Sequence, residues 1–188
     1  MGVDIHIWTN NAEKILILED NAPENRLSRT FLGLVGNGDL QDIANRASVN
    51  IAAINDMAGY DEDMDELEAY GDDMSEAEKK VKMKEIKERN ERCNNNIDRV
   101  IKTVDTLINA AAKLKNLADV IHTYKDRDYR KDVNQFYKEA DEFYFSDFHL
   151  DKDNRDFGYN FGFDLRIFQR FVAYAKEKGA TMVYFIYM

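Results

Sequence analysis

The chain of 188 residues contains one cysteine, one proline and no apolar run long enough to span a membrane. With Cys93 alone, no disulfide can form within the chain, which fits a reducing compartment. A single proline excludes proline-rich linkers, and a spanning helix would need about 20 consecutive apolar residues. The N-terminus has no basic segment followed by an apolar stretch, the pattern of a signal peptide. We therefore expect a cytoplasmic protein with no membrane partner.

Basic residues are missing from one stretch of the chain. Residues 61–78 contain ten acidic and no basic side chains, whereas residues 79–92 contain seven basic ones. The other 26 acidic residues match the 26 basic ones, so the acidic stretch accounts for the whole formal net charge of −10. Because phosphate binding requires a positive surface, nucleic acid is not expected as a direct ligand.

The apolar patterning predicts an α+β fold in a single domain, residues 1–188. Residues 3–9 alternate in polarity and residues 181–187 are almost all apolar, so both are expected to be strands. The apolar run within residues 14–19 predicts a central strand. The N-terminal hairpin and the C-terminal strand would form a small antiparallel sheet with helices packed on it.

Helical spacing and end signals predict the helices. One helix is expected over residues 26–35, and a longer one is expected to be capped by Asp39 and to end at Gly59. Asp164 is expected to cap a helix that ends before Gly179. A further helix at residues 130–140 and a strand at residues 143–145 complete the prediction.

A heptad pattern over residues 76–122 predicts either one long helix or two helices broken at residues 94–96. Ser75 and Glu78 have the spacing of a capping box at its start. Its first half has a narrow apolar seam and its second half a wide apolar face, so the second half should be buried. We therefore predict that residues 60–92 form a protruding helical arm, acidic on one limb and basic on the other.

The first candidate for a ligand site is on the N-terminal strand. Asp4 and His6 are two residues apart, so they share one face of a strand. A carboxylate beside an imidazole can bind a metal or act as a base. The alternative is a histidine that is merely satisfied by a neighbouring acid.

The second candidate is the loop of residues 147–164. Its aspartates resemble a calcium loop, but Arg155 and Gly162 stand where oxygen ligands are needed, so it predicts at most an irregular cation site. Its glycines lie among aromatic residues before a helix start, where an anion could bind and a base could stack, or where rings simply pack. The combined candidate site comprises Asp4, His6, His149, Tyr159 and Phe161. No catalytic motif, resident metal site or cofactor fingerprint is evident, which favours a binding protein over an enzyme.

The opening hexapeptide, Met1 to His6, resembles the start of an uncharacterised group of phage and bacterial proteins that begin Met-Gly-Cys-Asp-Ile-His. Val3 stands in place of the cysteine, and the similarity does not extend beyond residue 36. The resemblance implies a mobile-element origin and assigns no activity.

Our leading hypothesis is a non-enzymatic, phage-encoded binding protein. Its acidic stretch would imitate a phosphate backbone and occupy a basic, nucleic-acid-binding surface of a host protein, such as a defence nuclease. The predicted partner-binding residues are Asp61, Glu62, Asp63, Asp65, Glu66, Glu68, Asp72 and Asp73. The same stretch could instead be a solvated face, and its field would cancel if the basic limb lay beside it.

Two further hypotheses remain open. One is a small-ligand or nucleotide-binding protein, either a sink or an enzyme, with a site at residues 147–164 near the N-terminal strand. The other is an assembly component that works through the arm. Two copies of the chain could also pair through the long helix.

Overall fold

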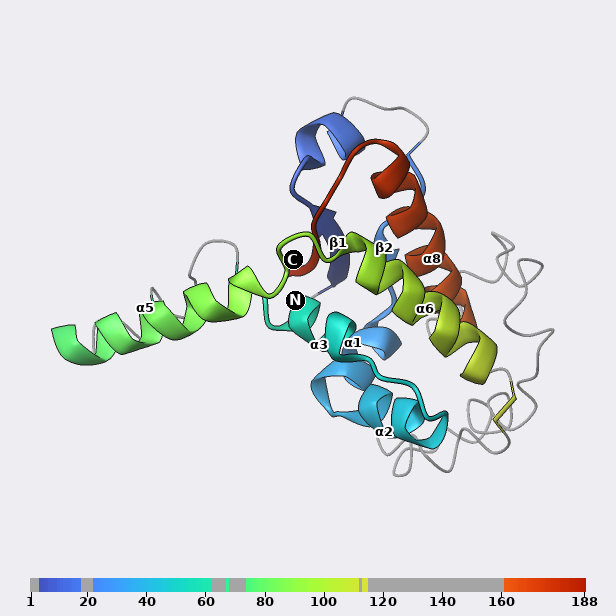
Figure 1. The fold of residues 1–188 in the computed structure, drawn as a ribbon, viewed down its shortest axis with the longest axis horizontal. Helices are drawn as coiled ribbons and strands as arrows, with labels where there is room; N and C mark the ends of the chain where they lie inside the picture. Colours follow the sequence, from blue (N-terminus) through green and yellow to red (C-terminus); the bar gives the residue numbers. More distant parts are fainter. Residues whose placement is uncertain (1–3, 18–21, 62–66, 68–73, 112, 115–160) are drawn as a thin grey trace.

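The computed structural model describes residues 4–17, 22–61, 67, 74–111, 113–114 and 161–188. It confirms the α+β class, with helices packed on a small antiparallel sheet (Figure 1). The described strands are β1 (Ile5–Thr9), β2 (Arg26–Leu27) and β3 (Val183–Tyr187), in the order β2-β1-β3. The sheet therefore joins the beginning of the chain to its end.

The register of β1 against β3 separates a buried face of the sheet from a partly exposed one. Ile5 lies opposite Tyr187 and Ile7 lies opposite Phe185, and Ile5, Ile7 and Phe185 are buried. His6 lies on the other face, between Ile186 and Arg26 on the neighbouring strands. This two-residue alternation is what the sequence predicted for β1.

Phenylalanine rings connect the buried face of the sheet to the helices. Phe31, on α1 (Arg29–Gly36), lies 6.2 Å from Phe168 and 6.4 Å from Phe161, between ring centroids. Both of these rings belong to α8 (Phe161–Glu177). Phe185 of β3 closes the cluster at 6.3 Å from Phe31. Aromatic pairs at these distances add about 0.5–1.5 kcal/mol each beyond the area they bury.

The expected strand over residues 14–19 is wrong for the residues that are described. A short π-helix, η1 (Glu13–Ile17), stands there, and the second strand is β2 instead. Ile15 is fully buried in this turn, so an apolar side chain that the sequence pattern assigns to a central strand reaches the core from a helical turn instead. The helix expected over residues 26–35 is therefore shorter at its start. Arg26 and Leu27 form β2, and the helix begins at Arg29 with Ser28 as its N-cap.

The helix expected between Asp39 and Gly59 is two helices, α2 (Asp39–Arg46) and α3 (Ala52–Ala58). Gly38 rather than Asp39 is the N-cap of α2, and Gly59 follows α3 as expected. Between the helices Ser48 has a φ of 57°, a left-handed conformation that ends a helix. The apolar residues keep nearly helical spacing across this break, which is why the pattern did not reveal it.

The long heptad region is two helices within the residues described, α5 (Glu76–Glu91) and α6 (Ile97–Ala111). The break lies at residues 92–96, where Asn95 adopts a φ of 53°. Asparagine tolerates this conformation better than most residues. The predicted capping box is confirmed, because Ser75 and Glu78 each bond the other's backbone N–H.

Asp164 does not cap α8, contrary to the prediction. The helix begins at Phe161, and Asp164 lies inside its first turn, fully buried. Its carboxylate accepts hydrogen bonds from Ser28, the N-cap of α1, and not from the N–H groups at the start of its own helix.

The expected helix at 130–140 and strand at 143–145 lie outside the described residues. No helix within the described part is both long and apolar enough to cross a bilayer.

Candidate functional site

Helix α5 projects away from the body formed by the sheet and the other labelled helices (Figure 1). Ile86 is its only buried residue, although the helix is sixteen residues long. Val81 and Met83 are 60% and 46% exposed. A helix with this little burial draws almost no stability from tertiary packing, so local interactions must hold it.

Local interactions along α5 supply part of that stability. The capping box at Ser75 lowers the pKa of Glu78 through hydrogen bonds from the serine side chain and backbone. Lys84 lies 3.6 Å from Glu88, one turn along the helix. The helix carries six basic and five acidic residues, so by itself it is nearly neutral. A groove of about 340 Å³ runs along one side, lined by Met74, Ala77, Glu78, Val81, Lys82 and Glu85.

The segment that joins α5 to α6 is bonded into the body; we call residues 89–99 the root of the arm. Asn96 is fully buried there, and its amide forms two hydrogen bonds with the backbone of Val183. Its Nδ2 donates to the carbonyl at 2.8 Å, and its Oδ1 accepts from the N–H at 2.9 Å. Removal of this side chain would leave two buried backbone groups unpaired, at about 1–3 kcal/mol each.

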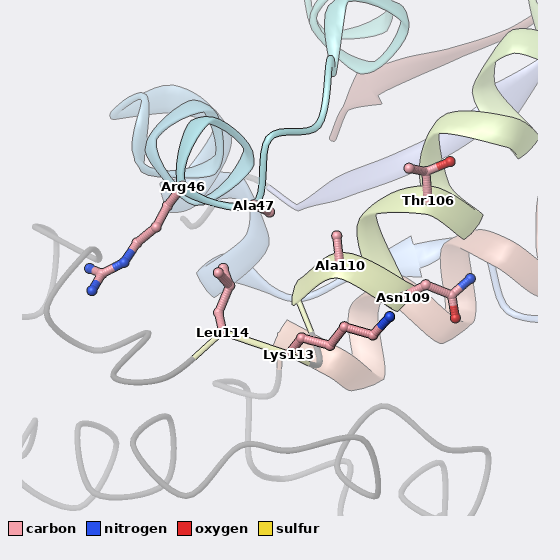
Figure 2. Close-up of a pocket in the computed structure, with 7 residues that line it drawn as sticks. All are labelled: Arg46, Ala47, Thr106, Asn109, Ala110, Lys113 and Leu114. Carbon is pink, nitrogen blue, oxygen red and sulfur yellow. The ribbon is translucent and has the colours of Figure 1, made fainter.

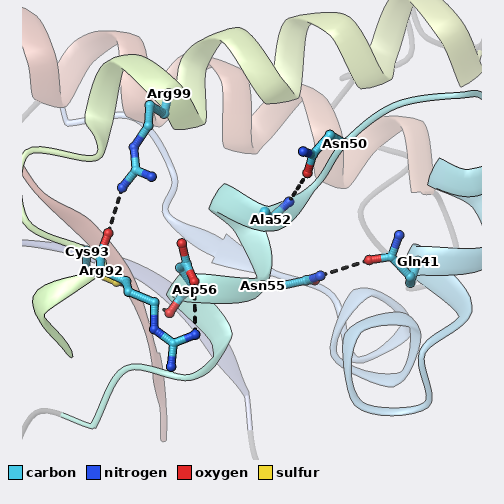
Figure 3. A network of polar contacts seen from close by, with 8 residues as sticks. All are labelled: Gln41, Asn50, Ala52, Asn55, Asp56, Arg92, Cys93 and Arg99. Carbon is cyan, nitrogen blue, oxygen red and sulfur yellow. Dashed lines mark hydrogen bonds and ion pairs between the residues drawn. The ribbon is translucent and has the colours of Figure 1, made fainter. Parts of the chain in front are cut away.

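The root is also tied to α3 and to the chain that leaves it (Figure 3). Arg92 forms an ion pair with Asp56 at 3.8 Å, and Arg99 donates to the carbonyl of Arg92 at 2.6 Å. Asn90 forms two bonds with the backbone of Asp61, at 3.0 Å and 2.7 Å. These contacts fix the direction in which α5 leaves the body.

Cys93 lies in the root but is not a nucleophile. The thiol is fully buried and donates to the carbonyl of Asp56 at 3.4 Å. Burial, reinforced by the Asp56 carboxylate, raises the pKa of the thiol to about 11. The thiolate is the reactive form of cysteine, so a thiol with this pKa is inert near neutral pH.

Of the eight predicted partner-binding acids, Asp61 alone belongs to the described part of the chain. Its backbone is held at the root by Asn90, which places the start of the acidic stretch beside the end of α5. The other seven are Glu62, Asp63, Asp65, Glu66, Glu68, Asp72 and Asp73, and they lie outside the described residues. The arm as a unit over residues 60–92, and pairing of two copies through it, stay predictions.

The residues of the predicted ligand site are divided by the sheet. Asp4 and His6 lie on the partly exposed face, where Asp4 forms an ion pair with Arg26 at 3.0 Å. Phe161 lies on the opposite, core side, where it is fully buried and stacks on Phe31. His149 and Tyr159 lie outside the described residues. No three His, Cys, Asp or Glu side chains in the described part gather as a metal site would require.

A separate cavity of about 480 Å³ lies where α2 and α6 end (Figure 2). Arg46 and Ala47 line it from α2, and Thr106, Asn109, Ala110, Lys113 and Leu114 line it from α6 and the residues after it. The sequence reasoning missed this cavity. Its two halves are about 60 residues apart in the chain, and neither half has a motif. The only available signal was a basic residue near the C-terminal end of each helix.

Comparison of the chain with family models, curated proteins and solved structures finds no match. What the protein does must therefore be inferred from its own residues. Two regions are candidates for a functional site: α5 with its root, and the cavity between α2 and α6.

Proposed function

We propose that this chain is a non-enzymatic binding protein that engages a partner protein through α5 and the acidic stretch before it. The observation that carries the proposal is a helix with one buried residue whose root is fixed by buried side-chain bonds. A helix that contributed only to the fold would bury a face. A fixed root places α5 in a defined direction, and preorganisation of this kind lowers the entropic cost of binding.

The charge of the arm favours a basic partner surface. Ten carboxylates within residues 61–78 create a strong negative potential that steers a positive surface toward the arm. The groove lined by Met74, Ala77 and Val81 adds an apolar contact next to these charges. Charged groups mainly raise the association rate, and a buried apolar anchor mainly slows dissociation.

The finer form of the proposal is that the partner's basic surface binds nucleic acid. A dense acidic stretch imitates a phosphate backbone, and the N-terminal resemblance points to a phage-encoded inhibitor of a host defence nuclease. In that case the chain would compete with DNA or RNA for the same surface. A competition experiment with DNA or RNA therefore distinguishes a partner that binds nucleic acid from any other partner with a basic surface.

The test is affinity capture from a lysate of the source organism or its host, with the intact chain and two charge variants. One variant neutralises Glu62, Asp63, Asp65 and Glu66 to their amides. The matched control neutralises four exposed acids outside the arm and its root, namely Glu13, Glu24, Asp42 and Glu177. We expect the wild type and the control to retain the same protein at low salt, and the arm variant to lose it.

The salt dependence of capture is the second criterion for the electrostatic part of the proposal. At about 1 M salt the screening length falls to about 3 Å, so retention by the wild type should also be lost. A partner that remains bound at this salt concentration, and equally to the arm variant, would contradict the electrostatic part of the proposal. If added DNA does not displace the partner, the nucleic-acid-mimic form is wrong.

A further inference from the structure

The side chains of α5 differ from one side of the helix to the other. Ile86 is buried, and Asn90, which lies one turn further along the same side, is partly covered. Ala77, Val81 and Glu85 follow one another at intervals of four residues, so they share another side, and all three are exposed. This second side of α5 is the one that carries the groove described above.

The groove has one apolar stripe, and its described wall belongs to a single segment. Met74, Ala77 and Val81 form the stripe, and every described residue that lines the groove lies within residues 74–85. Small-molecule sites bury most of the surface of their ligand, and a groove built along one helix does not enclose a ligand in this way. An elongated occupant that lies along α5 for about three turns would cover the stripe.

Carboxylates flank the apolar stripe. Glu78 and Glu85 line the groove, and Glu88, three residues after Glu85, lies on the same side of the helix. The capping box lowers the pKa of Glu78, which keeps this carboxylate ionised at neutral pH. Lys82 is the one basic residue among the described residues that line the groove. The border of the stripe is therefore mainly negative, and the acidic stretch of residues 61–78 ends at this groove.

A second copy of α5 fits the groove poorly. If two grooves faced each other in antiparallel orientation about Val81, Glu78 of each helix would lie opposite Glu85 of the other. In parallel orientation each glutamate would lie opposite its own copy, and like charges in such positions oppose association. Met83 is the only other large apolar side chain that α5 exposes, so the helix has no second apolar stripe to place in the groove.

The backbone of α5 restricts the conformation of an occupant. The N–H and C=O groups inside a helix bond to one another, so α5 has no free backbone edge to which an extended strand could add. A segment that covers an apolar stripe must then satisfy its own backbone groups, as a helix does. Two helices also pack closely, because the ridges of side chains on one fit between those on the other.

We propose that the groove of α5 binds an amphipathic helix whose narrow apolar stripe is flanked by lysine or arginine. This inference rests on the function proposed above and names the element of the partner that makes the contact. The apolar side chains of that helix cover Ala77 and Val81, and its basic side chains pair with Glu78 and Glu85. Because the apolar stripe is short, the charges beside it determine which helices bind.

The test is fluorescence anisotropy of the intact chain with three labelled peptides of about 18 residues, long enough to form a helix when bound. The first peptide has a narrow leucine stripe flanked by lysines. The second has the same composition in an order that has no stripe, and the third replaces the lysines of the first by glutamates. We expect the first peptide to bind about tenfold more tightly than the second, and the third not to bind. Circular dichroism should show that the first peptide gains helix in the complex.

Substitutions on α5 locate the binding. Val81→Gln should weaken binding of the first peptide about tenfold, since burial of the exposed part of a valine contributes about this much affinity. Met83→Gln is the matched control, because Met83 is also exposed on α5 but does not line the groove. Glu85→Gln should weaken binding about threefold, the usual effect of losing an exposed ion pair. Its charge-matched control is Glu13→Gln, an exposed position in η1 that should have no effect.

Three results would overturn the inference. Equal affinity for the first and second peptides, or equal losses in Val81→Gln and Met83→Gln, would leave only the electrostatic attraction of the proposed function. Absence of binding by both lysine peptides at submillimolar concentrations would also overturn it, and capture from lysate would still decide the proposed function separately. Sedimentation of the chain alone tests the remaining occupant, because a dimer that Val81→Gln abolishes would show a second copy in the groove.

Discussion

Replacement of Asp164 by asparagine should make the stability of the protein less dependent on pH. Asp164 is fully buried in the first turn of α8. Its two carboxylate oxygens accept from the Ser28 backbone N–H at 2.8 Å and from the Ser28 hydroxyl at 2.6 Å. Burial, with a smaller contribution from the charge of Glu24, raises the pKa of Asp164 from 3.8 to about 7 against the opposing effect of these bonds.

The size and sign of the effect follow from this shift. Between pH 3.8 and about 7 the folded chain holds a proton that the unfolded chain has released. The free energy of unfolding therefore falls as pH rises through this window, and it levels off above about pH 7. At about 1.4 kcal/mol per pKa unit, the total loss is about 4 kcal/mol, and roughly half of it falls between pH 5.5 and 8.

The assay is urea unfolding followed by circular dichroism at pH 5.5, 6, 7 and 8, on the wild type and on Asp164→Asn. The asparagine keeps an acceptor for Ser28 and never carries a charge, so the pH-dependent loss from this site disappears. Other titrating groups cancel in the difference between the two proteins. That difference should grow by about 2 kcal/mol, in favour of the variant, between pH 5.5 and 8.

A second variant separates charge from hydrogen bonding. Asp164→Ala removes the acceptors as well as the charge, so the N–H of the half-buried Ser28 loses its partner at a cost of about 1–3 kcal/mol at every pH. If the wild type and Asp164→Asn show parallel pH profiles, the carboxyl group does not titrate in this window. The assignment of the pH dependence to Asp164 would then be refuted.

Two other substitutions test the backbone of the fold. Asn96→Ala should lower the free energy of unfolding by about 2–6 kcal/mol, because both buried bonds to Val183 are lost; a loss below about 1 kcal/mol in urea titration would contradict the role given to this amide. Gly38→Ala should cost about 1–2 kcal/mol, since Gly38 has a φ of +79°. Gly36→Ala is the matched comparison two positions earlier, at the last residue of α1; Gly36 has open space around it, and this substitution should be neutral or stabilising in thermal unfolding.

The elements with strong local signals could be predicted from the sequence. The alternation in β1, the capping box at Ser75 and the glycine after α8 each reflect a rule that operates within a few residues. The sequence also offered the break between α5 and α6 as one of two alternatives, through its run of asparagines. Local chemistry was sufficient in these places because no distant partner competes with it.

The predictions that were wrong concern positions that depend on contacts between residues far apart in the chain. Asp164 has the sequence signature of a helix cap, but its carboxylate accepts hydrogen bonds from Ser28, which is 136 residues away in the chain. Ile15 belongs to an apolar run that is typical of a strand, but its side chain is buried in the core from a π-helical turn. The cavity could not be predicted because Arg46 and Lys113 come to line the same space only through the packing of α2 against α6. Tertiary contacts decide these positions, and periodicity does not report them.

The bond between Asn96 and Val183 also bears on whether strands of different molecules can pair while the protein folds. Among the described strands β3 lies at the edge of the sheet, and an exposed edge offers unpaired backbone groups to the edge of another molecule. The Asn96 amide occupies this edge at Val183, and α3 lies against the same strand, with the Tyr187 hydroxyl bonded to the carbonyl of Ala58. An apolar strand of this composition would otherwise promote aggregation. The residue that anchors the arm therefore also blocks intermolecular strand pairing, and loss of Asn96 should increase aggregation as well as reduce stability.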